Sequence, residues 1–132
     1  DYGHHPTEVK ATLKAARQLN PQRIWAVFQP HRYTRTRQLY KEFGAAFGDA
    51  DKVIVNSIYP ASEQPIPGVT GELIAKEIKS HGIDVKYMEE KREIVDYLAR
   101  EVKSGDLVIT IGAGHIWTVS RDLFQTLQDR GV

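Results

Sequence analysis

Leu107-Val108-Ile109-Thr110-Ile111, followed at once by Gly112-Ala113-Gly114, is the stretch that decides the fold class. A short apolar run rich in β-branched residues suits a strand that is buried on both faces of a parallel sheet. Weaker runs of the same kind predict three more strands, at 24–28, at 53–55 with an extension toward Ile58, and at 85–88. The chain is therefore expected to build a sheet from buried strands.

Helical periodicity fills the segments between these runs. Apolar residues spaced three and four apart predict five amphipathic helices. Their apolar faces are Val9-Leu13-Ala16-Leu19, Leu39-Phe43-Ala46-Phe47, Leu73-Ile74-Ile78, Ile94-Val95-Leu98-Val102 and Ile116-Val119-Leu123-Leu127. Because helices and strands alternate, the sequence predicts an α/β fold, a three-layer Rossmann-like domain with a mostly parallel sheet flanked by about five helices.

Composition limits the classes of function. A chain of 132 residues with 41% hydrophobic side chains suits a single domain over 1–132. The net charge of +1 argues against a nucleic-acid binder. The absence of cysteine excludes disulfides and thiolate chemistry and fits a cytoplasmic protein. No apolar run approaches the ~20 residues that cross a membrane. The chain opens on Asp1 rather than methionine, so we expect a fragment of a longer protein.

A basic cluster follows the strand at 24–28. His31, Arg32, Arg35 and Arg37 lie before or in the first turn of a helix, and no acidic residue appears until Glu42. Ligands of open α/β sheets bind beyond the carboxyl ends of the strands, so this cluster predicts a site for a phosphate or carboxylate. The alternative is a solvated basic face that pairs with acids elsewhere. For the site to form, the strands at 24–28 and 107–111 should be neighbours.

Three other segments leave alternatives open. Gly112-Ala113-Gly114 could contact a phosphate or simply allow a tight turn, since it lacks the spacing of known phosphate loops. His115 could face a ligand or cap a helix. The opening Asp1-Tyr2-Gly3-His4-His5 suits a nucleotide better than a metal, although the histidines could also be helix caps. The proline-rich segment 59–68 is long and stiff, which is typical of a functional loop.

The chain resembles the C-terminal domain of the Mur ligase family in several motifs that occur in the same order. These motifs are Asp-Tyr-Gly-His-His-Pro-Thr-Glu at 1–8, Phe-Gln-Pro-His-Arg-Tyr-Thr-Arg-Thr at 28–36, Ile-Tyr-Pro-Ala-Ser-Glu at 58–63, Pro-Ile-Pro-Gly at 65–68 and Gly-Ala-Gly at 112–114. The resemblance covers essentially the whole chain. Two positions depart from it, because family members more often have glycine at 62 and often lack histidine at 115.

The resemblance implies an enzyme of peptidoglycan biosynthesis that uses ATP and magnesium to join L-alanine to UDP-N-acetylmuramate through an acyl phosphate. It implies that Asp1 contacts the ATP ribose, that Tyr2 lies beside the adenine and that His4 reaches toward phosphate. It also implies that His31, Arg32 and Arg35 lie at the amino-acid and acyl-phosphate site. No catalytic residue and no metal ligand is assigned within the chain.

By the same resemblance, the central ATPase domain, with the magnesium ligands, and the N-terminal UDP-binding domain lie outside this sequence. We therefore expect the isolated chain to be inactive. Two other interpretations remain: a related ligase that recycles cell-wall tripeptide, against which the run at 31–35 speaks, and a non-catalytic α/β module that binds a nucleotide or an anion. A nucleic-acid module is disfavoured by the neutral charge and the lack of aromatic stacking platforms.

Overall fold

A computed structural model describes residues 5–131 of the chain. In that range helices and strands alternate, as the sequence predicts. The elements are α1 (Pro6–Arg17), β1 (Ile24–Phe28), α2 (Tyr33–Gly44), β2 (Lys52–Val55), α3 (Gly71–Ser80), β3 (Asp84–Tyr87), α4 (Lys91–Glu101), β4 (Leu107–Ile111) and α5 (Trp117–Asp129). None of these helices has the length and apolar character needed to cross a membrane.

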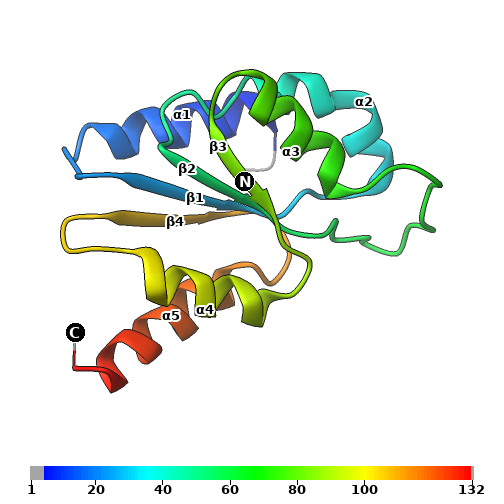
Figure 1. Cartoon of the computed structure of the whole chain (residues 1–132). Coiled ribbons are helices and arrows are strands. Elements are labelled where there is room, and N and C mark those ends of the chain that lie inside the picture. The colour runs from blue at the N-terminus through cyan, green and yellow to red at the C-terminus, as the bar shows by residue number, and fades with distance from the viewer. Residues whose placement is uncertain (1–4, 132) are drawn as a thin grey trace.

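The four strands form one sheet in the order β3-β2-β1-β4, and every pair is parallel. The predicted neighbours are confirmed, since Ile24 lies opposite Leu107 and Phe28 lies opposite Ile111. Helices α1, α2 and α3 cover one face of the sheet and α4 and α5 cover the other (Figure 1). The result is the predicted three-layer α/β fold.

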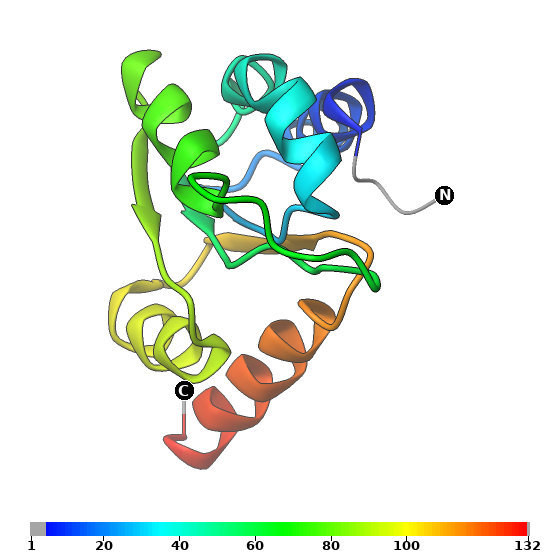
Figure 2. The same ribbon diagram turned by 90° about the vertical axis from the view of Figure 1, so that its right-hand side faces the viewer.

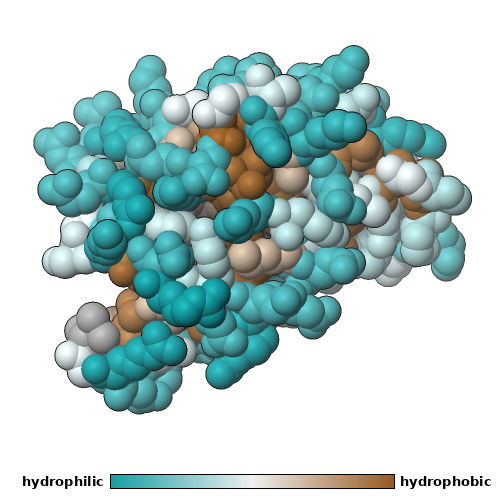
Figure 3. Space-filling view, in the orientation of Figure 1, coloured by the Kyte–Doolittle hydropathy of each residue, from teal (hydrophilic) through white to brown (hydrophobic). Residues whose placement is uncertain are grey.

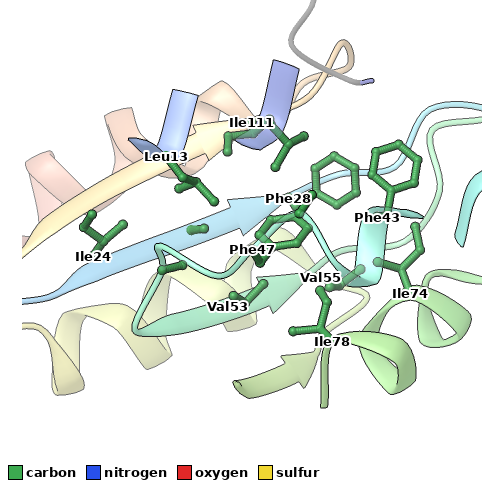
Figure 4. Close-up of a cluster of buried hydrophobic side chains, with 14 of the residues drawn as sticks. Leu13, Ile24, Phe28, Phe43, Phe47, Val53, Val55, Ile74, Ile78 and Ile111 are labelled. Atoms are coloured by element: carbon green, nitrogen blue, oxygen red, sulfur yellow. The ribbon is translucent and has the colours of Figure 1, made fainter. Parts of the chain in front are cut away.

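Strand β1 supplies both hydrophobic cores, because its side chains alternate between the two faces. Ile24, Ala26 and Phe28 point into the core beneath α1, α2 and α3, where Phe28 packs against Phe43 and Phe47 with ring centroids 5.1 and 5.4 Å away (Figure 4). Trp25 and Val27 belong to the core beneath α4 and α5. Burying one such side chain stabilises the fold by about 1.5–3 kcal/mol.

Burial on both faces was predicted for all four strands, and it is correct only for the central pair. β1 and β2 are buried, whereas β3 alternates between exposed and half-buried residues and β4 is half-buried except at Ile111. Both are outer strands of the sheet that residues 5–131 form. The face of the molecule in Figure 3 is mostly hydrophilic, and its hydrophobic surface is confined to separate patches.

Leu19 was predicted on the apolar face of the first helix, and this prediction is wrong. The side chain is 72% exposed. The helix ends at Arg17, and Asn20 turns the chain away with a positive φ of 54°. Leu19 is therefore in the turn that precedes β1, outside the helical repeat that buries Val9 and Leu13.

Candidate functional site

The candidate site lies at the carboxyl ends of β1 and β4. The chain leaves β1 toward α2 on one face of the sheet and leaves β4 toward α5 on the other, so the two loops diverge (Figures 1 and 2). Such a divergence between neighbouring strands is where ligands bind in open α/β sheets. The prediction of a switch point between these two strands is thus confirmed by the topology.

Two loops are joined along this edge. The segment after β1 runs parallel to the start of the proline-rich loop, with His31 and Tyr59 paired in an isolated bridge. The Arg32 amide donates to the Tyr59 carbonyl at 2.8 Å, and the Tyr59 amide donates to the Pro30 carbonyl at 2.8 Å. These hydrogen bonds fix the backbone that carries the basic cluster.

Arg32 and Arg35 face the same cleft. This cavity of about 380 Å³ is lined by His5, Arg32, Thr34, Arg35, Gln38 and Leu39. It shares His5 and Leu39 with a second cavity of about 460 Å³ between the start of α1 and the side of α2. Among residues 5–131, neither arginine forms an ion pair with a carboxylate. Both arginines thus line one cleft, and a guanidinium group there can bind an anion.

The first turn of α2 already holds an anion from within the chain. One carboxylate oxygen of Glu63 accepts hydrogen bonds from the Tyr33 amide at 2.6 Å and the Thr34 amide at 3.2 Å, and the other accepts from the Thr34 hydroxyl at 2.5 Å. These hydrogen bonds hold the pKa of Glu63 below its usual range, and the bond from the Thr34 hydroxyl has the largest effect. The sequence suggested an external anion at this helix start, but the amides are occupied. A ligand in the cleft would be bound by the guanidinium groups.

His31 lies next to the arginines and packs on an aromatic ring. Its imidazole stacks on Tyr59 with centroids 5.9 Å apart and planes 17° apart, and Tyr59 meets His115 edge-on at 6.2 Å. Burial, and then the charges of Arg32 and Arg35, lower the pKa of His31 below its ordinary value. Both effects favour the neutral form of the imidazole. The sequence left two roles open for His115, contact with a ligand or capping of a helix. In the structure its ring instead packs against Tyr59.

Glycine is required at position 114 by close packing. A Cβ there would lie 2.6 Å from Oε1 of Gln29 and 2.9 Å from the Tyr59 ring. Gly112 has a positive φ of 149°, in which a Cβ is also unfavourable. Close packing at Gly114 and the backbone conformation at Gly112 explain both glycines without a ligand. Neither glycine by itself therefore indicates a phosphate site.

Sequence reasoning missed two buried amides that hold the edge together. Gln29 donates from Nε2 to the Ser57 carbonyl at 3.2 Å. Asn56 donates from Nδ2 to the carbonyls of Met88 and Glu89 at 2.8 and 2.9 Å. Each is a polar residue directly after a buried strand, which is the signal that could have found it. Their function is to connect neighbouring loops.

The opening segment is described only from His5 onward. His5 caps α1, since its Nδ1 accepts from the Thr7 amide at 3.2 Å while Glu8 accepts from the His5 amide at 3.3 Å. The predicted nucleotide contacts Asp1, Tyr2 and His4 lie outside the described residues. No cluster of three metal-ligating side chains occurs in the part of the chain that the structure describes.

A parallel α/β sheet with a cleft at its switch point has the architecture of domains that bind ligands beyond the carboxyl ends of their strands, and here two arginines line that cleft. Residues 1–114 match the family described as "Mur ligase, glutamate ligase domain". The chain belongs to the Mur ligase family.

Named relatives agree with this assignment. A UDP-N-acetylmuramate–L-alanine ligase of Trichlorobacter lovleyi is 53% identical over 129 residues, which are 96% of this chain and 28% of that protein. Its counterpart in Desulforamulus reducens is 50% identical over 98% of this chain and 28% of its own length. The chain thus spans about 28% of the length of these curated relatives.

Solved structures match the fold. The structure of a UDP-N-acetylmuramate-alanine ligase from Thermotoga maritima superposes with a TM-score of 0.79 at 27% identity, covering 98% of this chain and 26% of that one. A murein peptide ligase from Psychrobacter arcticus superposes with a TM-score of 0.75 at 20% identity, over 96% of this chain and 26% of that chain. At that identity the second likeness concerns the fold alone.

Proposed function

We propose that this chain is the amino-acid-binding domain of an ATP-dependent ligase that joins L-alanine to UDP-N-acetylmuramate in peptidoglycan biosynthesis. The observation that carries the proposal is the cleft in which Arg32 and Arg35 lie together with no acidic partner among the described residues. The names of the relatives at 50–53% identity supply the substrates. Because the reaction consumes ATP, we place the enzyme in the cytoplasm.

The reaction sets two tasks for the cleft. ATP transfers its terminal phosphoryl group to the muramate carboxylate, which gives an acyl phosphate and ADP. The alanine amine then attacks the acyl carbon, loses a proton and expels inorganic phosphate as the amide forms. Alanine must be held by its carboxylate so that the amine faces the acyl carbon. A planar guanidinium can hold a carboxylate by two parallel hydrogen bonds, which suits Arg32 or Arg35 to this task. The other can neutralise charge on the phosphoryl oxygens.

His31 is adjacent to Arg32, although it is not among the residues that line the cleft. Its lowered pKa favours the uncharged imidazole beside the two arginines. It can donate or accept a hydrogen bond to the substrate without competing for the carboxylate. We assign it to substrate binding with the two arginines.

ATP and magnesium would be held mainly by the other domains of the enzyme, in the part of the relatives that this chain does not span. From this chain we propose that Asp1 contacts the ribose, Tyr2 the adenine and His4 the phosphates. His5, the residue directly before α1, lines the cleft with the arginines. The UDP-sugar is expected to be bound by the N-terminal domain.

The proposal is tested by assaying phosphate release from the full-length enzyme with UDP-N-acetylmuramate and ATP. Turnover that depends on L-alanine supports it, and turnover that depends on a cell-wall tripeptide instead would assign the enzyme to recycling. Calorimetry of the isolated chain with ATP addresses the other alternative. Tight binding without the other domains would favour a nucleotide-sensing module, and the isolated chain should show no ATP turnover above a blank.

A further inference from the structure

We propose that Glu63 is a positioning residue for the cleft: by capping α2 it sets the guanidinium groups of Arg32 and Arg35 without touching the substrate. The inference rests on the proposed function, in which these arginines bind the amino acid. It assigns a role to the proline-rich loop, which carries Glu63.

The cap of α2 is provided from a distant part of the chain. Helices usually begin with a Ser, Thr, Asp or Asn whose side chain accepts from the first turn. At α2 the N-cap residue is Arg32, whose side chain makes no capping hydrogen bond. Glu63, which is 30 residues away from Tyr33, takes this task by accepting from Tyr33 and Thr34. The capping task is thus separated from Arg32, and its side chain can point into the cleft.

The backbone of Arg32 is held in an uncommon conformation. Its φ of 70° and ψ of 143° lie where residues with a side chain are rarely found. The conformation is fixed on both sides, because the Arg32 amide donates to Tyr59 and its carbonyl accepts from the Thr36 amide at 3.2 Å and the Thr36 hydroxyl at 2.9 Å. Glu63 fixes the next two residues. Without the carboxylate, the chain at Arg32 can relax and move the guanidinium.

A tight turn brings the carboxylate to the helix. The Glu63 amide donates to the Pro60 carbonyl at 3.0 Å, and both central residues, Ala61 and Ser62, have positive φ values of 51° and 75°. This turn directs the side chain of Glu63 back to α2. The same loop contacts Arg32 through the Tyr59 carbonyl, so the turn and the cleft are one connected unit.

The negative charge of Glu63 is favourable at the start of α2. The arginines oppose the positive end of the α2 dipole, and a carboxylate at the helix start offsets that unfavourable term. Glu63 directs its oxygens at amides and a hydroxyl, and it forms no ion pair with Arg32 or Arg35. The guanidinium groups therefore keep their hydrogen-bond donors for a ligand.

The test compares Glu63→Gln with Thr70→Ala in the full-length enzyme. Thr70 caps α3 by accepting from the Glu72 amide at 3.1 Å and does not line the cleft, so its variant controls for the loss of a helix cap. We expect Glu63→Gln to raise the KM for L-alanine about tenfold or more, since small displacements of a binding group are costly. The KM for ATP and kcat should change less than about threefold. Thr70→Ala should leave all three constants unchanged.

Glu63→Asp is the conservative variant and also covers the case in which Glu63→Gln does not fold. It keeps the carboxylate on a shorter side chain, so it should recover part of the affinity for L-alanine. An unchanged KM in Glu63→Gln, or an equal rise in Thr70→Ala, would overturn the positioning role.

Arg32→Ala and Arg35→Ala separate this inference from the proposed function. If either arginine variant raises the KM for L-alanine and Glu63→Gln does not, only the inference fails. If neither arginine variant raises it, the proposed function fails as well. A readout that does not depend on activity is the pH titration of the Tyr33 and Thr34 amide signals by NMR. They should follow the Glu63 carboxyl, with a midpoint below its ordinary pKa of 4.5, and the titration should disappear in Glu63→Gln.

Discussion

The two edges of the sheet both carry arginines, but these arginines have different surroundings. At the amino ends of the strands, Arg23 pairs with Asp106 at 2.8 Å, and Arg17 pairs with Asp51 at 2.9 Å. At the carboxyl ends, Arg32 and Arg35 have no acidic partner among residues 5–131, and the carboxylate of Glu63 at the start of α2 is bound to backbone amides. One edge is therefore internally neutralised and the other is left able to take up an anion.

This difference shows why net charge says little about function. A chain with a net charge of +1 has almost as many acids as bases. Arg17 and Arg23 nevertheless have acidic partners, whereas Arg32 and Arg35 have none among residues 5–131. Paired arginines contribute to stability, whereas unpaired ones in a cleft are available to a ligand. Substitutions at the two edges should accordingly affect different properties: stability at the amino edge and substrate binding at the carboxyl edge.

The largest expected effect is on activity, from Arg32→Ala or Arg35→Ala in the full-length enzyme. Loss of one charge-assisted contact in a closed site costs about 2–4 kcal/mol, or roughly thirty- to a thousand-fold in rate. If the arginine holds the alanine carboxylate, the KM for L-alanine rises. If it stabilises the acyl phosphate, kcat falls at saturating alanine. Steady-state kinetics distinguish the two.

Arg37→Ala is the matched control, since Arg37 is on the same helix, is exposed and does not line the cleft. It should leave the kinetics unchanged. Arg32→Lys should recover only part of the activity, because an ammonium cannot make the paired planar contact. Equal losses in all three alanine variants would show that general positive charge matters rather than the cleft.

At the opposite edge, Asp106→Asn should lower stability and leave the KM for L-alanine unchanged. The Asp106 side chain is only 2% exposed and accepts from Arg23, from Trp25 Nε1 at 2.9 Å and from the Lys103 amide at 3.0 Å. Removing its charge should reduce the free energy of unfolding by about 2–3 kcal/mol, measured by urea denaturation. Asp84→Asn breaks the exposed pair with Lys52 and should cost at most about 1 kcal/mol.

The effect of Asp106 should depend on pH in a defined direction. Burial raises the pKa of this carboxyl, but the hydrogen bonds from Arg23, Lys103 and Trp25 outweigh burial and hold the pKa below its ordinary 3.8. Its contribution is therefore complete above pH 3.8 and is lost as the pH falls through the lower, folded-state pKa. In Asp106→Asn the free energy of unfolding should therefore fall less steeply with decreasing pH in this acidic range. If it falls as steeply as in the unsubstituted protein, Asp106 is not the group responsible.

Gly114→Ala should disturb the carboxyl edge by packing alone. The added Cβ would lie 2.9 Å from the Tyr59 ring, which is held between His31 and His115 and has little room to move. Overpacking of this kind costs about 1–3 kcal/mol. Gly82→Ala is a comparison in which a Cβ meets open space but the positive φ of 79° remains, so it isolates the backbone term. Differential scanning calorimetry of both variants separates the two causes.

The elements were predictable from the sequence, while the connections between them were not. The continuous apolar run that buries β1 on both faces is a local pattern, and so is the helix start at Pro6, which the structure confirms. The cap that Glu63 provides to α2 joins residues 30 apart, and no local pattern contains it. The arginine cluster was visible as a possible anion site, but only the fold shows that the helix amides are already occupied.

A substitution at position 62 should have the smallest effect on stability, and it is the one expected to increase stability. Ser62 has a positive φ of 75° in the turn that delivers Glu63, a conformation that glycine adopts at no steric cost. Its side chain is exposed and makes no hydrogen bond within the described part of the chain, so removing it loses no contact there. The left-handed conformation costs other residues about 1–2 kcal/mol, and glycine gives part of this back as greater freedom in the unfolded chain.

Ser62→Gly should therefore raise the free energy of unfolding by about 0.5–1 kcal/mol, which corresponds to a melting temperature about 2–4 °C higher. Ser104→Gly is the matched control, since Ser104 is also exposed in a turn but has no positive φ, and there glycine should lower stability. Because the turn geometry is preserved, the KM for L-alanine should not change. If Ser62→Gly lowers stability as Ser104→Gly does, the left-handed turn is not the conformation that positions Glu63, and the cap of α2 requires another explanation.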